Sequence, residues 1–98
     1  MDYVSRDTIL NTMTNSLDTI KQKYNLDDID IREQPADDDR YYFGYKVEKG
    51  GKEYTIHLPY VKNEEGEMMI EKIEWIVQGN HGEEIGYSNL DEVFSDKL

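Results

Sequence analysis

The sequence contains no cysteine in its 98 residues. Disulfide bridges, cysteine-ligated zinc and a cysteine nucleophile are therefore excluded, and packing and hydrogen bonds must hold the fold together. No apolar stretch approaches the length of a membrane span, and the first residues lack the basic start and the apolar core of a signal peptide. We therefore expect a cytoplasmic protein, and the lack of cysteine agrees with a reducing compartment.

Positive charge is scarce as well. Eleven Lys and Arg stand against 22 Asp and Glu, which leaves a formal net charge of −11. Nucleic acids and anionic membranes attract clustered positive charge, so we expect neither of them as a direct partner. The acidity either keeps the protein soluble and monomeric or recruits a basic partner.

The length suits one domain with one hydrophobic core, spanning residues 1–98. Residues 5–24 predict an amphipathic helix, with Ser5 as its N-cap and Asp7 in its first turn. Apolar residues recur on one side of this helix at the helical period. They are Ile9, Met13, Leu17, Ile20 and Tyr24.

Residues 40–60 predict a β-hairpin, because large apolar residues alternate with other residues on both sides of Gly50-Gly51. If Lys49 pairs with Lys52, every large apolar side chain of the hairpin falls on one face. The same register also places Tyr42 opposite Pro59. A shift of one residue would destroy this pattern, so the pattern itself supports the register.

The remaining elements are shorter. Ile29 and Ile31 alternate with charged residues and predict an edge strand. A fourth strand is expected over 67–78, with Lys62 opposite Glu67. That register places Trp75 opposite Tyr54 and predicts that Trp75 is largely buried. A short helix should begin near residue 88. The expected fold is α+β: the N-terminal helix packed on a four-stranded antiparallel meander sheet, followed by a short C-terminal helix.

Candidate chemistry is sparse. The acidic stretch from Asp28 fails the EF-hand pattern, because Arg32 and Glu33 occupy positions that need an oxygen ligand and glycine. The acidic loop 37–39 and His81 are interpreted as solvated loop residues. His57 is expected to be a partly exposed strand residue. We therefore predict no catalytic residue, no cofactor and no metal site.

One group of residues departs from the alternation expected of an open sheet face. In the predicted registers Tyr42, Pro59 and Ile70 lie side by side opposite the core, with Val61 and Met68 next to them. Either the C-terminal helix covers this strip, through Leu90 and Phe94, or the strip is a contact surface for a partner protein or a second copy of the chain, or its residues are incidentally exposed apolar side chains.

Three segments carry a resemblance to known proteins. They are Val4-Ser5-Arg6-Asp7-Thr8-Ile9-Leu10, the hairpin around Tyr41-Tyr42-Phe43-Gly44-Tyr45 and Tyr54-Thr55-Ile56-His57-Leu58-Pro59-Tyr60, and Leu90-Asp91-Glu92-Val93-Phe94. Together they resemble a family of short acidic bacterial proteins with no assigned function. The resemblance implies a bacterial source and a free-standing domain, and it implies no activity and no site residue.

Three functions remain open. The leading one is a non-enzymatic binding or regulatory domain. The second is an acidic mimic that blocks a nucleic-acid-binding protein, with acid clusters at 27–30, 37–39, 64–67 and 83–84 imitating phosphates. The third is a small-molecule binder or small enzyme that uses His57, Tyr42 and a nearby acid, and it needs a pocket between helix and sheet.

Overall fold

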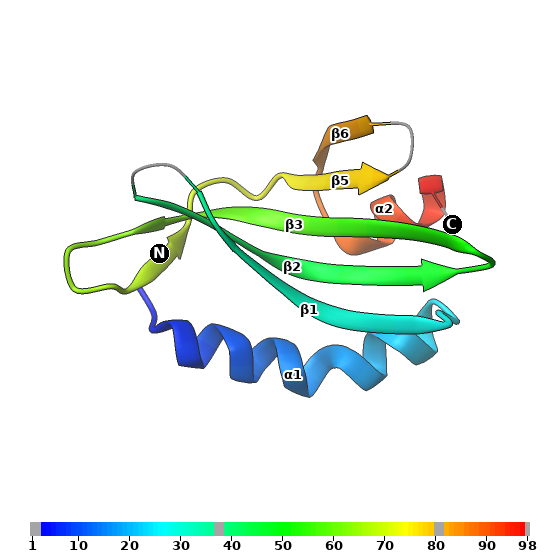
Figure 1. Ribbon diagram of the computed structural model, residues 1–98, viewed down its shortest axis with the longest axis horizontal. Coiled ribbons are helices and arrows are strands. Elements are labelled where there is room, and N and C mark those ends of the chain that lie inside the picture. Colours follow the sequence, from blue (N-terminus) through cyan, green and yellow to red (C-terminus); the bar gives the residue numbers. More distant parts are fainter. Residues whose placement is uncertain (1–2, 37–38, 80–81, 98) are drawn as a thin grey trace.

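The computed structural model describes residues 3–36, 39–79 and 82–97. These residues form two helices and one antiparallel sheet (Figure 1). The elements are α1 (Arg6–Lys23), β1 (Asp28–Pro35), β2 (Arg40–Lys49), β3 (Lys52–Lys62), β4 (Met68–Ile70), β5 (Trp75–Gly79), β6 (Gly82–Tyr87) and α2 (Leu90–Lys97). The strand order is β1-β2-β3-β5-β6, with β4 also paired to β3. The predicted α+β class is confirmed, but the described residues form six strands rather than four.

Helix α1 begins where the sequence predicts. Ser5 is the N-cap, and its side-chain oxygen accepts a hydrogen bond of 3.2 Å from the backbone N–H of Thr8. This bond satisfies one of the N–H groups that the first turn leaves without a partner. Ile9, Met13 and Ile20 are buried against the sheet. The apolar stripe read from the sequence is therefore the packing face of α1.

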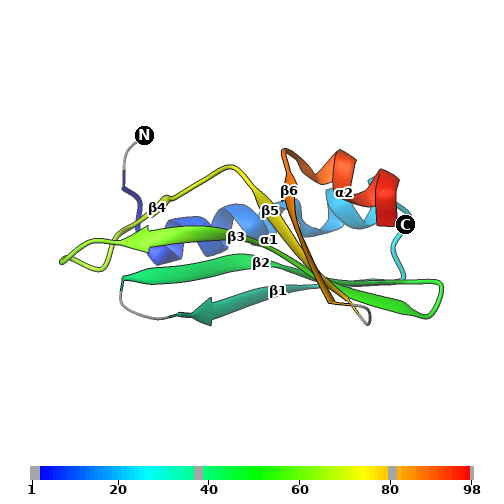
Figure 2. The same ribbon diagram turned by 90° about the horizontal axis from the view of Figure 1, so that it is seen from above.

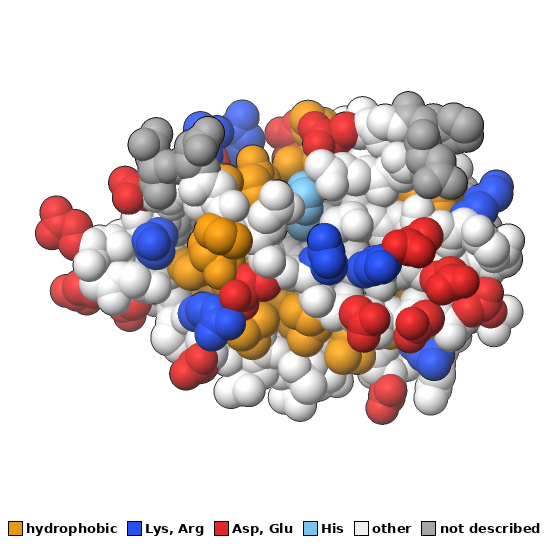
Figure 3. Space-filling model, viewed as in Figure 1, with side chains coloured by type: hydrophobic (Ala, Val, Ile, Leu, Met, Phe, Trp, Pro, Cys, Tyr) orange, Lys and Arg blue, Asp and Glu red, His pale blue; other side chains and the backbone are white. Residues whose placement is uncertain are grey.

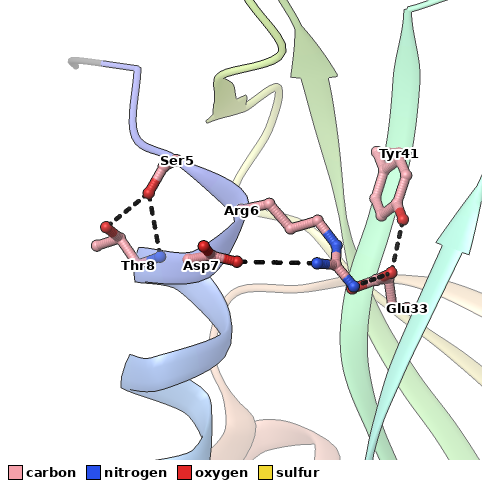
Figure 4. A network of polar contacts seen from close by, with 6 residues as sticks. All are labelled: Ser5, Arg6, Asp7, Thr8, Glu33 and Tyr41. Carbon is pink, nitrogen blue, oxygen red and sulfur yellow. Dashed lines mark hydrogen bonds and ion pairs between the residues drawn. The ribbon is translucent and has the colours of Figure 1, made fainter.

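A polar network ties the first turn of α1 to β1 and β2 (Figure 4). The Arg6 guanidinium lies 2.8 Å from a carboxylate oxygen of Glu33, and the Tyr41 hydroxyl donates to the same carboxylate at 2.8 Å. These two contacts, the Arg6 hydrogen bond foremost, lower the pKa of Glu33 below its usual value, although burial acts in the opposite direction. The carboxylate therefore fixes α1 across the sheet.

The β2–β3 hairpin forms in the predicted register. Lys49 pairs with Lys52, and Tyr42 pairs with Pro59. Gly50 and Gly51 have φ values of 59° and 81°, a conformation that glycine adopts without a steric penalty. The two-residue turn and the alternation of side chains are thus sufficient to set this part of the sheet.

The predicted fourth strand is interrupted, and Pro59 gives the physical reason. Pro59 has no N–H to donate, and its carbonyl accepts from Glu71 N at 2.9 Å. The N–H and C=O of one strand residue point to the same neighbour, so the missing donor faces the next strand. β4 consequently pairs with β3 at residues 60–62, and β5 pairs with β3 at residues 55–57. The chain adds β6, which covers residues predicted in part as a loop and absent from the predicted four-stranded sheet.

The predicted pairing of Lys62 with Glu67 is wrong by one residue, because Lys62 pairs with Met68. Residues 63–67 form a five-residue turn in which the side-chain oxygen of Asn63 accepts from the backbone N–H groups of Glu65 and Glu67, at 3.0 and 2.9 Å. A shift of one residue exchanges the two faces of a strand. The side chains of β4 therefore lie on the opposite faces from those predicted.

Both helices cover the same face of the sheet (Figure 2). Phe43, Val47, Ile56 and Val77 of the sheet are at most 2% exposed, and Val93 of α2 is fully buried with them. Trp75 packs against this core but is only half-buried, which corrects the prediction that it is largely buried. Ile73, two residues before Trp75, is 62% exposed, since the chain leaves the sheet between β4 and β5.

Candidate functional site

The sheet has one face that α1 and α2 do not cover, which we call the open face. Helix α2 packs against β5 and β6 on the side of α1, where the Phe94 ring stacks on Tyr24 with the ring centroids 4.0 Å apart. The possibility that Leu90 and Phe94 cover the predicted strip is therefore wrong. The open face is the place to look for a contact surface.

The pairing of the strands defines which side chains share this face. From β1 to β6, one row runs Arg32, Gly44, His57, Ile76 and Ile85. Neighbouring rows pair Tyr42 with Pro59 and Val61 with Met69. The apolar and aromatic members of these rows form what we call the open-face patch. The patch consists of Tyr42, His57, Pro59, Val61, Met69, Ile76 and Ile85.

The structure retains three of the five residues predicted as a protein contact. Tyr42, Pro59 and Val61 lie on the open face and are half-buried. Ile70 pairs with Tyr60 and Met68 with Lys62, so both lie on the helix-covered face, and Met68 is only 3% exposed. The one-residue shift at the turn 63–67 places Met69 on the open face instead of these two residues. The count of residues in that turn is the signal that could have identified it.

His57 lies at the centre of the open-face patch and is 5% exposed, which corrects the expectation of a partly exposed residue. The Tyr42 ring packs beside it, with the ring centroids 4.7 Å apart. Its cross-strand neighbours are Gly44 of β2 and Ile76 of β5.

Burial decides the protonation of this histidine. Desolvation lowers the pKa of His57 below its ordinary value, because the charged form loses its contact with water. The Glu83 carboxylate opposes this shift, and Arg32 reinforces it. His57 is therefore neutral near pH 7, and it contributes a polarisable but uncharged surface to the patch.

Acidic side chains gather at the end of the open face next to the β2–β3 turn (Figure 3). Strand pairing places Asp28 opposite Glu48, and Glu48 opposite Glu53. Lys46 pairs with Asp30 in the neighbouring row and makes an ion pair of 2.8 Å with Glu53. With four carboxylates around one ammonium group, this end of the face is negatively charged.

Metal and acid–base chemistry were the other possibilities. In the part of the chain that the structure describes, no group of three His, Asp or Glu side chains is placed to hold a metal ion. His81 and two residues of the acidic loop, Asp37 and Asp38, lie outside the described residues. The structure does bring His57 and Tyr42 together, with Glu83 near enough to affect the imidazole.

The geometry defines a two-layer α+β domain with one helix-covered face and one open face that is apolar at its centre and acidic at one end. The chain belongs to a family of unknown function, DUF5634, whose model matches residues 3–96. This confirms the resemblance to a family without an assigned function. No curated protein matches the chain. None of the described helices is both long and apolar enough to span a membrane.

Proposed function

We propose that this protein is a non-enzymatic binding or regulatory domain that docks a basic partner protein on its open face, in the cytoplasm. The observation that carries the proposal is the open-face patch, since an uncovered sheet face is normally polar. Apart from the neutral imidazole of His57, its side chains are aliphatic or, at Tyr42, phenolic, and the strand pairing places them in neighbouring rows. A contiguous apolar patch with a charged rim is typical of a protein interface.

Charge identifies the kind of partner. A second copy of the chain would bring together two molecules that each carry a net charge of −11, and this repulsion disfavours a homodimer. A partner with an apolar centre and Lys or Arg beside it would complement both the patch and the Asp28, Glu48 and Glu53 carboxylates. The proposal therefore commits to a basic protein rather than to a homodimer.

The test begins with a partner captured from a bacterial lysate and then purified. Ile85→Asp introduces a charge into the patch at a side chain that is 57% exposed, so the fold should survive. We expect this variant to weaken binding about tenfold or more. Circular dichroism confirms that the variant is folded.

A pair of charge reversals tests the acidic end. Asp30→Lys and Asp18→Lys change the net charge equally, and both positions are exposed, but Asp18 lies on α1. Asp30→Lys should slow association and reduce its dependence on salt, whereas Asp18→Lys should leave both nearly unchanged. Equal effects of the two variants, or no effect of Ile85→Asp, would contradict the proposal.

The acidic-mimic function makes a different prediction. A mimic occupies the nucleic-acid site of its partner, so DNA or RNA added to the purified complex should displace it. Docking through the open-face patch predicts a complex that tolerates moderate salt, because apolar burial is not screened by ions. If nucleic acid displaces the protein from its partner, and Asp30→Lys also weakens that binding, the results favour the mimic.

A further inference from the structure

A groove of about 530 Å³ lies on the other side of the sheet, between α1 and the start of α2. It lies where the two helices diverge, since α1 packs mainly along β1 whereas α2 packs against β5 and β6. Its volume falls in the range of small-molecule sites. The open-face patch and this groove are on opposite faces, so the two can be tested independently.

Aromatic side chains from three elements line the groove. Trp75 of β5 is half-buried there, Tyr24 at the end of α1 is stacked on Phe94, and Tyr45 of β2 is only 7% exposed, so Trp75 supplies most of the accessible ring surface. The face of an indole or phenol ring carries negative partial charge and attracts the weakly positive C–H groups of a saturated ring. The groove therefore offers stacking surface for the apolar face of a ligand.

The polar residues that line the groove carry no net charge. Asn15, Ser16 and Thr19 of α1 form one wall, and Ser88 and Asn89 precede α2 on the other. The two charged groups of the lining cancel, since Lys23 lies 3.2 Å from the Asp91 carboxylate. The Tyr24 hydroxyl donates to the same carboxylate. A molecule with 34% charged residues thus has a groove with no net charge.

Helix α1 supplies an independent observation. Between Asp7 and Lys21, Asp18 is its one charged residue, although the solvent-facing positions of a helix usually carry Glu and Lys. The exposed positions hold Asn and Thr instead, which are weak helix formers. The hydroxyls of Thr12 and Thr14 even hydrogen-bond back to backbone carbonyls, at 2.9 and 2.8 Å. This composition lowers the intrinsic stability of the helix and gives it an uncharged surface that can form hydrogen bonds.

We propose that the groove binds a short neutral oligosaccharide. Such a ligand has a C–H face that stacks on Trp75, and hydroxyl groups that both donate to and accept from Asn and Thr side chains. Anionic ligands are repelled by the acidic molecule, and a fully apolar ligand would leave the Asn and Thr groups without hydrogen-bond partners. A neutral, hydroxylated ring satisfies both parts of the lining.

Trp75 is the single tryptophan of the chain, so its fluorescence reports on this groove directly. The probes are maltotetraose, cellotetraose and chitotetraose, each titrated into the purified full-length protein. We expect at least one of them to shift the emission of Trp75 to shorter wavelength and to saturate with a Kd of about 1 mM or tighter. Amide chemical shifts of α1 and residues 88–91 should move in the same titration.

Two substitutions of the same residue type provide the matched control. Asn15→Ala removes a groove side chain, whereas Asn11→Ala makes the same change one turn earlier, outside the groove lining. Both raise helix propensity, so neither should unfold α1. Asn15→Ala should weaken binding about tenfold and Asn11→Ala should not.

Either of two outcomes would overturn the proposal. One is that no probe changes the fluorescence or the amide shifts at concentrations of about 10 mM. The other is that Asn15→Ala and Asn11→Ala weaken binding equally. The groove would instead be a protein contact if the partner protein captured from the lysate, and no sugar, shifted the amide signals of the groove residues. Ile85→Asp leaves the sugar titration unchanged, so failure of one site does not imply failure of the other.

Discussion

Gly44 in β2 leaves no room for a side chain. A Cβ atom added there would lie 1.9 Å from the carbonyl oxygen of Ile56 and 2.4 Å from the Cα atom of His57. These are backbone atoms, so relief requires β2 and β3 to separate. The close approach also brings the His57 imidazole down onto the sheet beside the Tyr42 ring. One glycine thus shapes the centre of the open face.

Gly44→Ala should therefore lower the free energy of unfolding by roughly 3 kcal/mol or more. Urea denaturation followed by circular dichroism measures the loss. Gly50→Ala is the control, because it strains a φ of 59° but meets no atom within 4 Å. That control should cost only about 1 kcal/mol. Equal stability of Gly44→Ala and the wild type would show that the strands are not this close.

Burial of His57 predicts a pH dependence of stability. The pKa of His57 in the folded state lies below its ordinary value of 6.5, so the unfolded chain takes up the proton first as the pH falls. The free energy of unfolding should decrease as the pH drops from 6.5 toward the lower pKa of the folded state. Glu33 contributes a separate loss at more acidic pH, because its pKa lies below 4.5 when folded.

Melting temperatures measured between about pH 7.5 and pH 3 test this behaviour. The control is His57→Phe, which keeps an aromatic ring beside Tyr42 but cannot be protonated. It should remove the slope near neutral pH and leave the acidic loss intact. A wild type whose melting temperature is constant through this interval would contradict the burial of the imidazole.

At the scale of elements, the beginning of α1 is held by two separate devices. The Ser5 side chain caps the helix, and the ion pair between Arg6 and Glu33 fixes it against β1. The ion pair is partly exposed, with about half of the Arg6 side chain in contact with solvent, so water screens it. The cap should therefore contribute more to stability than the ion pair does.

Ser5→Ala should lower the free energy of unfolding by about 1 kcal/mol. Ser5→Asp retains an acceptor for the Thr8 N–H and places a negative charge at the positive end of the helix dipole. It should therefore leave the free energy of unfolding nearly unchanged. Thermal denaturation of the two variants measures both. A loss from Ser5→Asp equal to that from Ser5→Ala would show that the cap is not responsible.

Helix α2 is short, but it completes the core. Val93 is fully buried, and the Phe94 ring stacks on Tyr24 at the far end of α1. Phe94→Ala should cost roughly 3–5 kcal/mol, a large part of the stability of a small domain. Chemical denaturation measures the loss, and Ser95→Ala at the next, exposed position serves as the control. A cost below about 1 kcal/mol would mean that α2 contributes little to the stability of the core.

At the scale of the whole molecule, the net charge of −11 governs its encounters. It repels phosphates and other copies of the chain over a Debye length. The purified protein should therefore show no mobility shift with DNA or RNA at physiological salt, and it should sediment as a monomer. Tight binding to either nucleic acid would contradict the first expectation, and a dimer at micromolar concentration would contradict the second.

The sequence by itself determined the parts of the fold that depend on near neighbours. The cap at Ser5 and the turn at Gly50-Gly51 act within a few residues, so helix α1 and the register of β2 with β3 could be predicted. Alternation and helical periodicity then established the α+β class. Tyr42, Pro59 and Val61 were placed on the open face for the same reason, since they belong to this hairpin.

Tertiary structure decided the rest. The break between β4 and β5 arises because the missing N–H of Pro59 faces a neighbouring strand, and the extra residue in the turn 63–67 exchanged Ile70 for Met69 on the open face. The burial of His57 depends on how closely β2 and β3 approach at Gly44. The side chosen by α2 depends on where its buried residues find apolar partners. The burial of His57 and the side chosen by α2 are set by atoms distant in the chain, and a pattern of nearby residues carries no information about them.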